Sequence, residues 1–147
     1  MTNQQILDAL GRHVADATVL TQRLRAFHWM VTGHQFFQLH AFFEKEYDRW
    51  TDAADELAER AIALGGAPPL TLAEMLGRAS FEEVPGTLAS REMVARYVTD
   101  LEAMRDGFRK TLALAEEGGD RTTANLLDGQ LDGIEKSLWM LRAWLAS

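Results

Sequence analysis

Histidines and carboxylates gather in the first half of the 147-residue chain, at spacings that suit a metal site. Three of the four histidines, His28, His34 and His40, fall within thirteen residues. The stretch that follows carries acidic side chains at helical spacing, among them Glu44, Asp48, Asp52, Asp55 and Glu59. Imidazole combined with several carboxylates, and without thiolate, suits iron or manganese. The pattern therefore points to binding of a transition metal.

Four of these residues share one stripe of a helical wheel. With His40 at zero and about 100° per residue, Glu44 falls at about 40°, Asp55 at about 60° and Glu59 at about 100°. The stripe lies beside the apolar face of the helix, whereas a purely solvated charged face would lie opposite it. A carboxylate at the margin of a buried face needs a partner there, and a metal ion would be one.

A single helix cannot bring all four residues to one ion. Glu44 and Asp55 are eleven residues apart, which is about 16 Å along a helix, whereas metal–ligand bonds are about 2 Å long. The midpoint of this pair is also the midpoint of His40 and Glu59. A two-fold axis crossing the helix there would bring one end of the stripe to the other end in a second chain. His28 could then complete the set of ligands.

Two plainer interpretations remain open, and one other metal site is excluded. The pair His40 and Glu44, four residues apart, could form only a surface hydrogen bond. Asp55 and Glu59, next to Arg60, could form an ordinary solvated face. A di-iron centre inside one bundle uses two Glu-x-x-His motifs, and the chain contains none.

Four long segments without proline must position these side chains. Apolar residues recur every three or four positions, the period of an amphipathic helix, over residues 3–31, 35–64, 90–115 and 120–145. Glycine pairs at 65–66 and 118–119 predict helix ends. Ser90 is a predicted N-cap, and the last helix should begin near Asp120 or Thr123.

The predicted fold class is all-α, a four-helix bundle. A chain of this length forms one domain, here residues 1–147, and its 47% hydrophobic and 25% charged residues are typical of globular proteins. The link between the second and third helices is too long for a plain loop. Residues 70–78 within it could form a short extra helix.

Charge and cysteine content exclude several classes of function. The chain has no cysteine, which excludes disulfides, zinc fingers, iron–sulfur clusters and thiol catalysis and fits a cytoplasmic protein. The formal charge of −7 and the lack of a basic tail oppose DNA binding, which needs a lysine- and arginine-rich surface. We find no signal peptide and no membrane span, and so expect no membrane partner.

Several motifs together resemble the Dps family, the mini-ferritins of the ferritin-like superfamily. The run His28-Trp29-Met30-Val31-Thr32-Gly33, followed by Leu39-His40 and Glu44, is similar to the signature of that family. Residues 55–60, then 64–66 and Pro69, resemble the end of its second helix, and residues 135–141 resemble its closing segment. The likeness covers nearly the whole chain, in order and in spacing.

The resemblance implies a particular assembly and chemistry. It implies a hollow homo-dodecamer with ferroxidase centres at its two-fold interfaces, a short helix between the second and third helices, and a ferric mineral stored inside. Ferrous iron would be oxidised there, preferentially by hydrogen peroxide. The family's ligands, which also act as catalytic residues, map onto His28, His40 and Glu44 of one subunit and Asp55 and Glu59 of its neighbour.

Two residues at the implied centre need comment. Glu44 stands where the family commonly has aspartate, and its extra methylene shifts the carboxylate and could change metal affinity or the spacing of two irons. Trp29 would lie beside the centre, where it could intercept radicals or simply pack in the interface.

Iron would also need a way into the cavity. In relatives, acidic residues near the start of the last helix line three-fold pores, and the candidates here are Asp120, Asp128 and Asp132, with Asn125 where relatives often carry aspartate. An ordinary capped helix start is the alternative. Asp48 and Asp52 could face the cavity and nucleate mineral.

Three functions follow from the sequence and the resemblance. The first is an iron-storing ferroxidase that consumes peroxide. The second is a nucleoid-binding protein that protects DNA, which the missing basic tails disfavour. The third is a Dps-like cage whose metal site is altered or inactive, for which Glu44 is the reason. Of the remaining histidines, we expect His34 in an exposed loop and His13 on the solvated side of the first helix.

Overall fold

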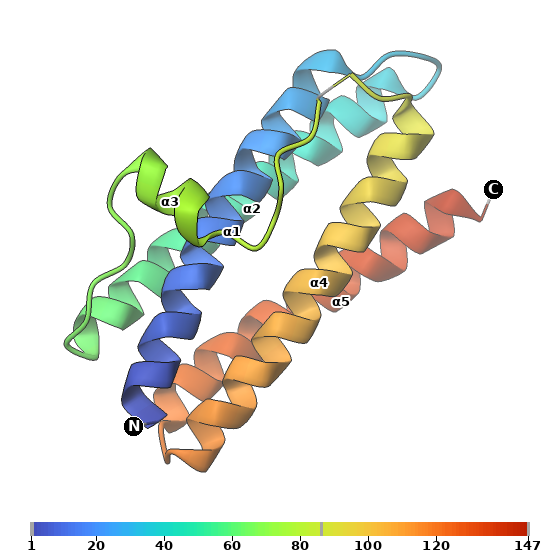
Figure 1. The fold of residues 1–147 in the computed structure, drawn as a ribbon. Helices are drawn as coiled ribbons and strands as arrows, with labels where there is room; N and C mark the ends of the chain where they lie inside the picture. Colours follow the sequence, from blue (N-terminus) through green and yellow to red (C-terminus); the bar gives the residue numbers. More distant parts are fainter. Residues whose placement is uncertain (1, 86, 147) are drawn as a thin grey trace.

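The chain folds into helices joined by short links in the computed structural model, which describes residues 2–85 and 87–146. Within these residues there is no strand, and the helices are α1 (Thr2–Met30), α2 (Phe36–Ala63), α3 (Leu72–Arg78), α4 (Ser90–Glu117) and α5 (Arg121–Leu145). Four long helices form the bundle, and α3 lies outside it against α1 (Figure 1). The predicted four-helix bundle with a short extra helix is confirmed.

Glycines and capping residues end the helices close to the predicted positions. Gly65 and Gly119 have φ angles of 90° and 76°, which side chains disfavour and glycine adopts freely. Asp120 caps α5 by accepting a hydrogen bond from the backbone N–H of Thr123 at 3.1 Å. The prediction for Ser90 is wrong, because the backbone is already helical there and Ala89 occupies the capping position without a side-chain hydrogen bond.

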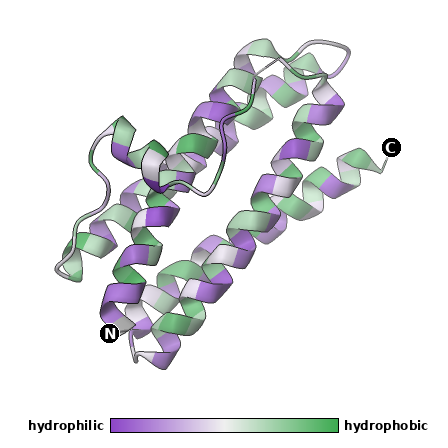
Figure 2. Ribbon diagram, in the orientation of Figure 1, coloured by the Kyte–Doolittle hydropathy of each residue, from purple (hydrophilic) through white to green (hydrophobic). Residues whose placement is uncertain are grey.

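Large apolar side chains fill the space between the four long helices. Hydrophilic and hydrophobic residues alternate along each helix (Figure 2), so that one face of each can be buried. Among the largest fully buried side chains are Phe27, Phe43, Trp50, Tyr97 and Phe108. None of the described helices is long and apolar enough to cross a bilayer.

A polar network lies at the centre of this apolar core. Glu46 of α2 is 2% exposed and accepts hydrogen bonds from the Tyr97 hydroxyl at 2.6 Å and the Ser137 hydroxyl at 2.9 Å. The Trp50 indole N–H donates to the Tyr97 oxygen at 2.8 Å. Burial, and then the charge of Glu46, raises the pKa of Tyr97 well above its usual value. The network joins α2, α4 and α5.

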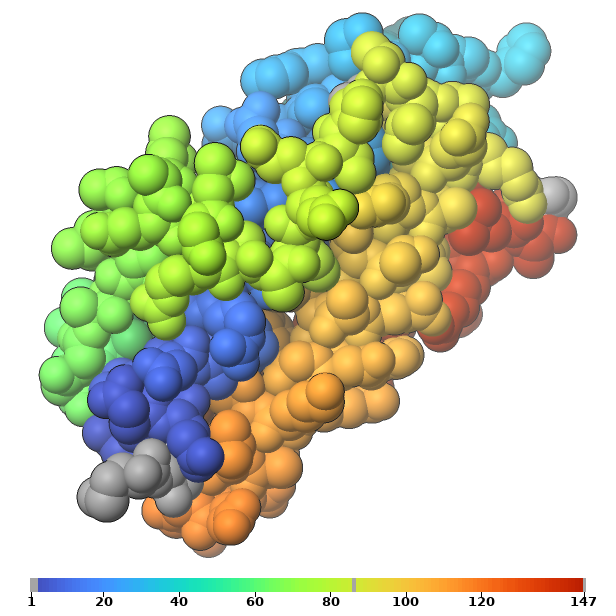
Figure 3. All heavy atoms as spheres, in the orientation of Figure 1, coloured from blue at the N-terminus to red at the C-terminus, as the bar shows by residue number. Residues whose placement is uncertain are grey.

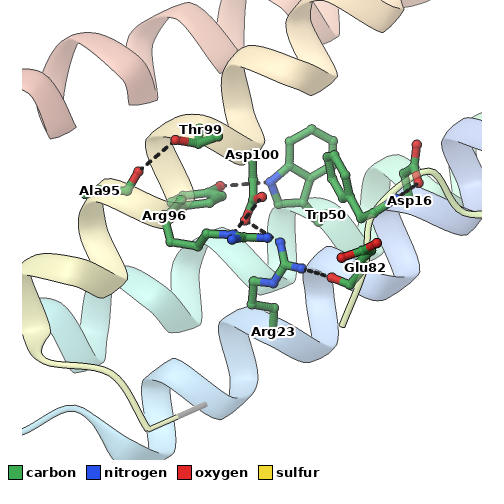
Figure 4. A network of polar contacts seen from close by, with 10 residues as sticks. Asp16, Arg23, Trp50, Glu82, Ala95, Arg96, Thr99 and Asp100 are labelled. Atoms are coloured by element: carbon green, nitrogen blue, oxygen red, sulfur yellow. Dashed lines mark hydrogen bonds and ion pairs between the residues drawn. The ribbon is translucent and has the colours of Figure 1, made fainter. Parts of the chain in front are cut away.

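A buried ion pair joins α1 to α4 (Figure 4). Arg23 of α1 donates to the Asp100 carboxylate at 2.6 Å and also contacts the carbonyl of Glu82 in the link before α4. Arg96 lies 3.6 Å from the other Asp100 oxygen. Burial raises the pKa of Asp100 despite both arginines. Loss of either partner of the Arg23–Asp100 pair would leave a buried charge uncompensated.

His13 is buried, so its predicted exposure is wrong. Only 4% of the residue is exposed, because α4 covers this part of α1. Its Nε2 lies 2.7 Å from the Thr111 hydroxyl, and its ring packs edge-on against Phe108. Burial, with a smaller contribution from the charge of Arg12, lowers the pKa of His13 from the usual 6.5 to about 4.

The buried His13 predicts a loss of stability in acid. Between pH 6.5 and about 4 the unfolded chain binds a proton at His13 and the folded chain does not, so protonation favours unfolding. The loss is about 3 kcal/mol over this window and is absent above pH 6.5. Urea unfolding at several pH values measures it. His13→Gln should flatten the pH dependence, while His34→Gln, at an exposed position, should not. Equal slopes for His13→Gln and the unmodified chain would contradict the prediction.

Candidate metal centre

The end of α1 and the beginning of α2 bring His28 and His40 together. The helices run antiparallel and are joined by only five residues, 31–35. The two imidazole rings stack with their centroids 3.7 Å apart and their planes 12° from parallel. His28 is 8% exposed and His40 is partly buried. The predicted proximity of these two histidines is therefore present within one chain.

Reciprocal hydrogen bonds fix both rings. Nδ1 of His28 lies 2.7 Å from the carbonyl oxygen of His40, and Nδ1 of His40 lies 2.8 Å from the carbonyl oxygen of His28. A carbonyl oxygen can only accept, so both Nδ1 atoms carry the proton. In the neutral rings each Nε2 then keeps its lone pair. A carbonyl that holds Nδ1–H is a common arrangement behind a metal-binding histidine.

Aromatic side chains enclose the histidine pair. Phe36 stacks on the other face of His40 with centroids 4.9 Å apart, and Tyr47 meets His28 edge-on at 5.5 Å. The Arg25 guanidinium lies over the Tyr47 ring at 5.0 Å. These neighbours leave the rings little freedom to rotate. Their role was not predicted, although Phe36 and Tyr47 belong to the apolar pattern of α2.

Glu44 supplies a carboxylate beside the histidines. Its Oε1 lies 3.8 Å from Nε2 of His28, and its side chain is 54% exposed. It follows His40 by one helical turn, so both project from the same side of α2. Two imidazole nitrogens and an exposed carboxylate can form part of a metal site that faces solvent.

Asp55 and Glu59 lie farther along α2, near its other end. Both are exposed, and neither has an ion pair or hydrogen bond with the described residues. Arg60, the neighbour that could have neutralised them, instead donates to Thr123 at 2.9 Å and Asp120 at 3.0 Å. Within residues 2–85 and 87–146, no three histidine or acidic side chains are close enough to hold a metal ion. The five predicted ligands therefore form two separate sets in one chain.

An apolar groove adjoins Asp55. It lies between α1, α2 and the segment containing α3 and has a volume of about 680 Å³. Leu70, Leu72 and Leu76, which also line the groove, are 74%, 76% and 51% exposed. At the other end of α2, Trp29 and Phe37 are 63% and 80% exposed. Large apolar side chains thus lie near both sets of predicted ligands.

The three predicted pore residues differ in their surroundings. Burial alone would raise the pKa of Asp120, but hydrogen bonds from Thr123 and the charge of Arg60 bring it below its usual value. Asp120 is therefore engaged as a helix cap. Asp132 pairs with Lys136 at 3.2 Å, with both side chains 70% exposed. Asp128 is exposed, as is His34 in the first turn, where its predicted exposure is confirmed.

Comparison with known proteins agrees with the fold and with this arrangement of helices. A family model for the ferritin-like domain, Ferritin, matches residues 7–147. The chain is 39% identical over 143 residues to DNA protection during starvation protein 2 of Bacillus anthracis, covering 97% of this chain and 98% of that protein.

Solved structures give the same family. A Dps protein from Bacillus brevis has a TM-score of 0.95 and 39% identity, with 98% of this chain and 97% of that one covered. A Dps protein from Vibrio cholerae, described as a member of a broad superfamily of ferritin-like diiron-carboxylate proteins, has a TM-score of 0.94 and 33% identity over 98% and 91%. The chain belongs to the Dps family of mini-ferritins.

Proposed function

We propose that this protein is a ferroxidase that oxidises ferrous iron with hydrogen peroxide and stores the ferric product inside a hollow homo-dodecamer. The catalytic site is formed by His28, His40 and Glu44 of one subunit with Asp55 and Glu59 of the next. Iron is the substrate and the stored cargo. Membership of the Dps family supports iron chemistry in general, and the residues of this chain support the location.

The fixed orientation of the two histidines carries the proposal. Both Nδ1 atoms donate to backbone carbonyls, so both Nε2 atoms keep a lone pair, and that of His28 lies beside Glu44. A histidine pair serving only to pack two helices would not need a carboxylate 3.8 Å from one Nε2. The carboxylates of Asp55 and Glu59 have no partners among the described residues and supply the negative charge that two ferrous ions require.

A second chain is the natural source of the missing carboxylates. The two sets of ligands lie at opposite ends of α2, and a two-fold axis across its middle exchanges those ends. The exposed leucines around the groove beside Asp55, and Trp29 beside His28, supply apolar surface of the kind that monomers rarely leave uncovered. Assembly would bury both surfaces and complete two equivalent sites at once.

The proposed reaction transfers two electrons in one event. Two ferrous ions each give one electron to a single hydrogen peroxide molecule, its O–O bond breaks, and two protons complete two molecules of water. Two ferric ions result and move inward to mineralise. A lone ferrous ion would give peroxide one electron and release hydroxyl radical, so a paired site prevents damage. Asp128 and Asp132 lie on the exposed side of α5. Unlike Asp120 they do not cap a helix, so they are the remaining pore candidates.

Loss of one ligand from each set should slow iron oxidation. In stopped-flow mixing of ferrous iron with peroxide, His28→Ala combined with Asp55→Ala should reduce the rate at least about tenfold, because each proposed site loses a nitrogen and a carboxylate ligand. His34→Ala, at an exposed turn, is the matched control and should react normally. The same mixing with oxygen measures the preferred oxidant. An unchanged peroxide rate in the double variant would refute the site.

The assembly must be measured in the same samples. Twelve chains of 16.5 kDa give a particle of about 198 kDa if the family assembly holds. A slow variant that keeps this mass has lost chemistry, whereas a slow variant that has dissociated has lost its interface.

DNA protection is the alternative function, suggested by the name of the Bacillus anthracis relative. The formal charge of −7 per chain is multiplied in an oligomer, and the chain has only three lysines. Phosphate binding needs clustered positive charge.

The charge predicts no DNA binding at low salt. Linear duplex DNA mixed with the assembled protein, without divalent cations, should migrate unchanged in a gel-shift experiment because two polyanions repel. The same mixture with added magnesium tests whether a cation bridge can overcome the repulsion. Clear retardation without magnesium would contradict the expectation and favour the DNA-protection function.

A further inference from the structure

A second cavity lies between α1 and α4, and none of the predicted metal ligands lines it. The segment that follows α3 closes one end of it, and its volume is about 450 Å³, which is within the usual range for small-molecule sites. Figure 3 shows the surface hollowed where blue α1, the yellow-green segment after α3 and orange α4 meet. Neither the family ligands nor the pore candidates line it.

Short side chains keep this cavity open, and a network of hydrogen bonds holds its wall. Gly107 on α4 and Ala9 on α1 line it, so no long side chain from these two positions fills it. Asp16 accepts hydrogen bonds from the Ser80 backbone N–H and hydroxyl, both at 2.6 Å, and from the Phe81 N–H at 3.2 Å. Its carboxylate is therefore fully used in fixing the segment after α3.

His13 lines the cavity, and one of its ring nitrogens has no partner among the described residues. The Thr111 hydroxyl donates to the carbonyl of Gly107 at 3.1 Å, so it accepts from Nε2–H of His13. Nδ1 then keeps its lone pair, and it has no hydrogen-bond partner among the described residues. The residue is only 4% exposed. Burial also lowers its pKa to about 4, which keeps the ring neutral and Nδ1 an acceptor at physiological pH.

The opening of the cavity carries positive charge, and its interior is largely apolar. Arg12 and Lys110 are exposed and line the opening. Asp8 also lines it and accepts a hydrogen bond from Gln4 at 2.8 Å. Behind these groups the lining includes the apolar side chains of Phe81, Met104 and Leu114.

We propose that this cavity binds a small carboxylic acid with a flat apolar body and a hydroxyl group. The hydroxyl donates a hydrogen bond to Nδ1 of His13, the body lies against the apolar wall, and the carboxylate faces Arg12 and Lys110. The ligand needs a donor at one end because a neutral Nδ1 can only accept. An anion is favoured at the other end because the two cations there, Arg12 and Lys110, outnumber the carboxylate of Asp8.

The probe is 4-hydroxybenzoate, titrated into the assembled protein at pH 7 by isothermal calorimetry. We expect saturable binding with one site per subunit. Benzoate, which lacks the donor, should bind about tenfold more weakly, since one hydrogen bond is lost and Nδ1 is left unpaired. Lys110→Gln should weaken 4-hydroxybenzoate several-fold, and added salt should do the same.

A pair of glycine variants provides the sharpest control. A Cβ at Gly107 would lie 3.2 Å from Cε1 of His13 and 3.9 Å from Nδ1, whereas a Cβ at Gly129 of α5 meets nothing within 4 Å. Both Gly→Ala changes raise helix propensity, but only Gly107→Ala adds a methyl group against the His13 ring, next to Nδ1. Binding should be lost in Gly107→Ala and retained in Gly129→Ala. No saturable binding, equal affinity for benzoate, or unchanged affinity in Gly107→Ala would each overturn the proposal.

Discussion

Two hydrogen bonds between the end of α1 and the beginning of α2 orient the two histidines on which the proposed metal site depends. Each histidine gives its Nδ1 proton to the backbone of the other, so turning either ring away would break this hydrogen bond and leave the Nδ1–H without its partner. The same bonds leave both Nε2 atoms unprotonated in the neutral rings, and that of His28 lies 3.8 Å from Glu44. The packing of α1 against α2 and the proposed metal binding therefore involve the same pair of side chains.

The centre of the bundle contains a buried carboxylate, Glu46, which serves the core and not the proposed surface site. Glu46 is surrounded there by the hydroxyls of Tyr97 and Ser137, and the remaining space is filled by aromatic rings. This carboxylate also pairs with Arg49 at 3.3 Å and stabilises the core, and within the described residues it has no second acidic partner for a metal. The unpartnered acids, Asp55 and Glu59, lie instead on the surface of α2. The buried Glu46 thus serves the core, whereas Asp55 and Glu59 lie on the surface, where a second chain could reach them.

Sequence periodicity predicted the helices because apolar spacing and glycine breaks are local properties. It could not predict which polar residues the neighbouring helix would cover. His13 was expected in solvent, yet Gly107 lets α4 approach closely enough to bury it, and that depends on tertiary packing. The reciprocal bonds of His28 and His40 were also beyond prediction, since they require the three-dimensional path of the turn. For Asp55 and Glu59 the spacing indicated a second chain, and their metal binding stays a prediction.

Subunit complementation tests the central claim that the site is shared between chains. A chain carrying His28→Ala and His40→Ala is co-expressed with one carrying Asp55→Ala and Glu59→Ala, so that mixed two-fold interfaces form. Each mixed interface then contains one intact and one doubly defective site, and random pairing restores about one quarter of the sites. Peroxide-dependent iron oxidation should accordingly return to about one quarter of the unmodified rate, while each variant alone stays inactive. A mixed assembly as inactive as its parents would contradict the account.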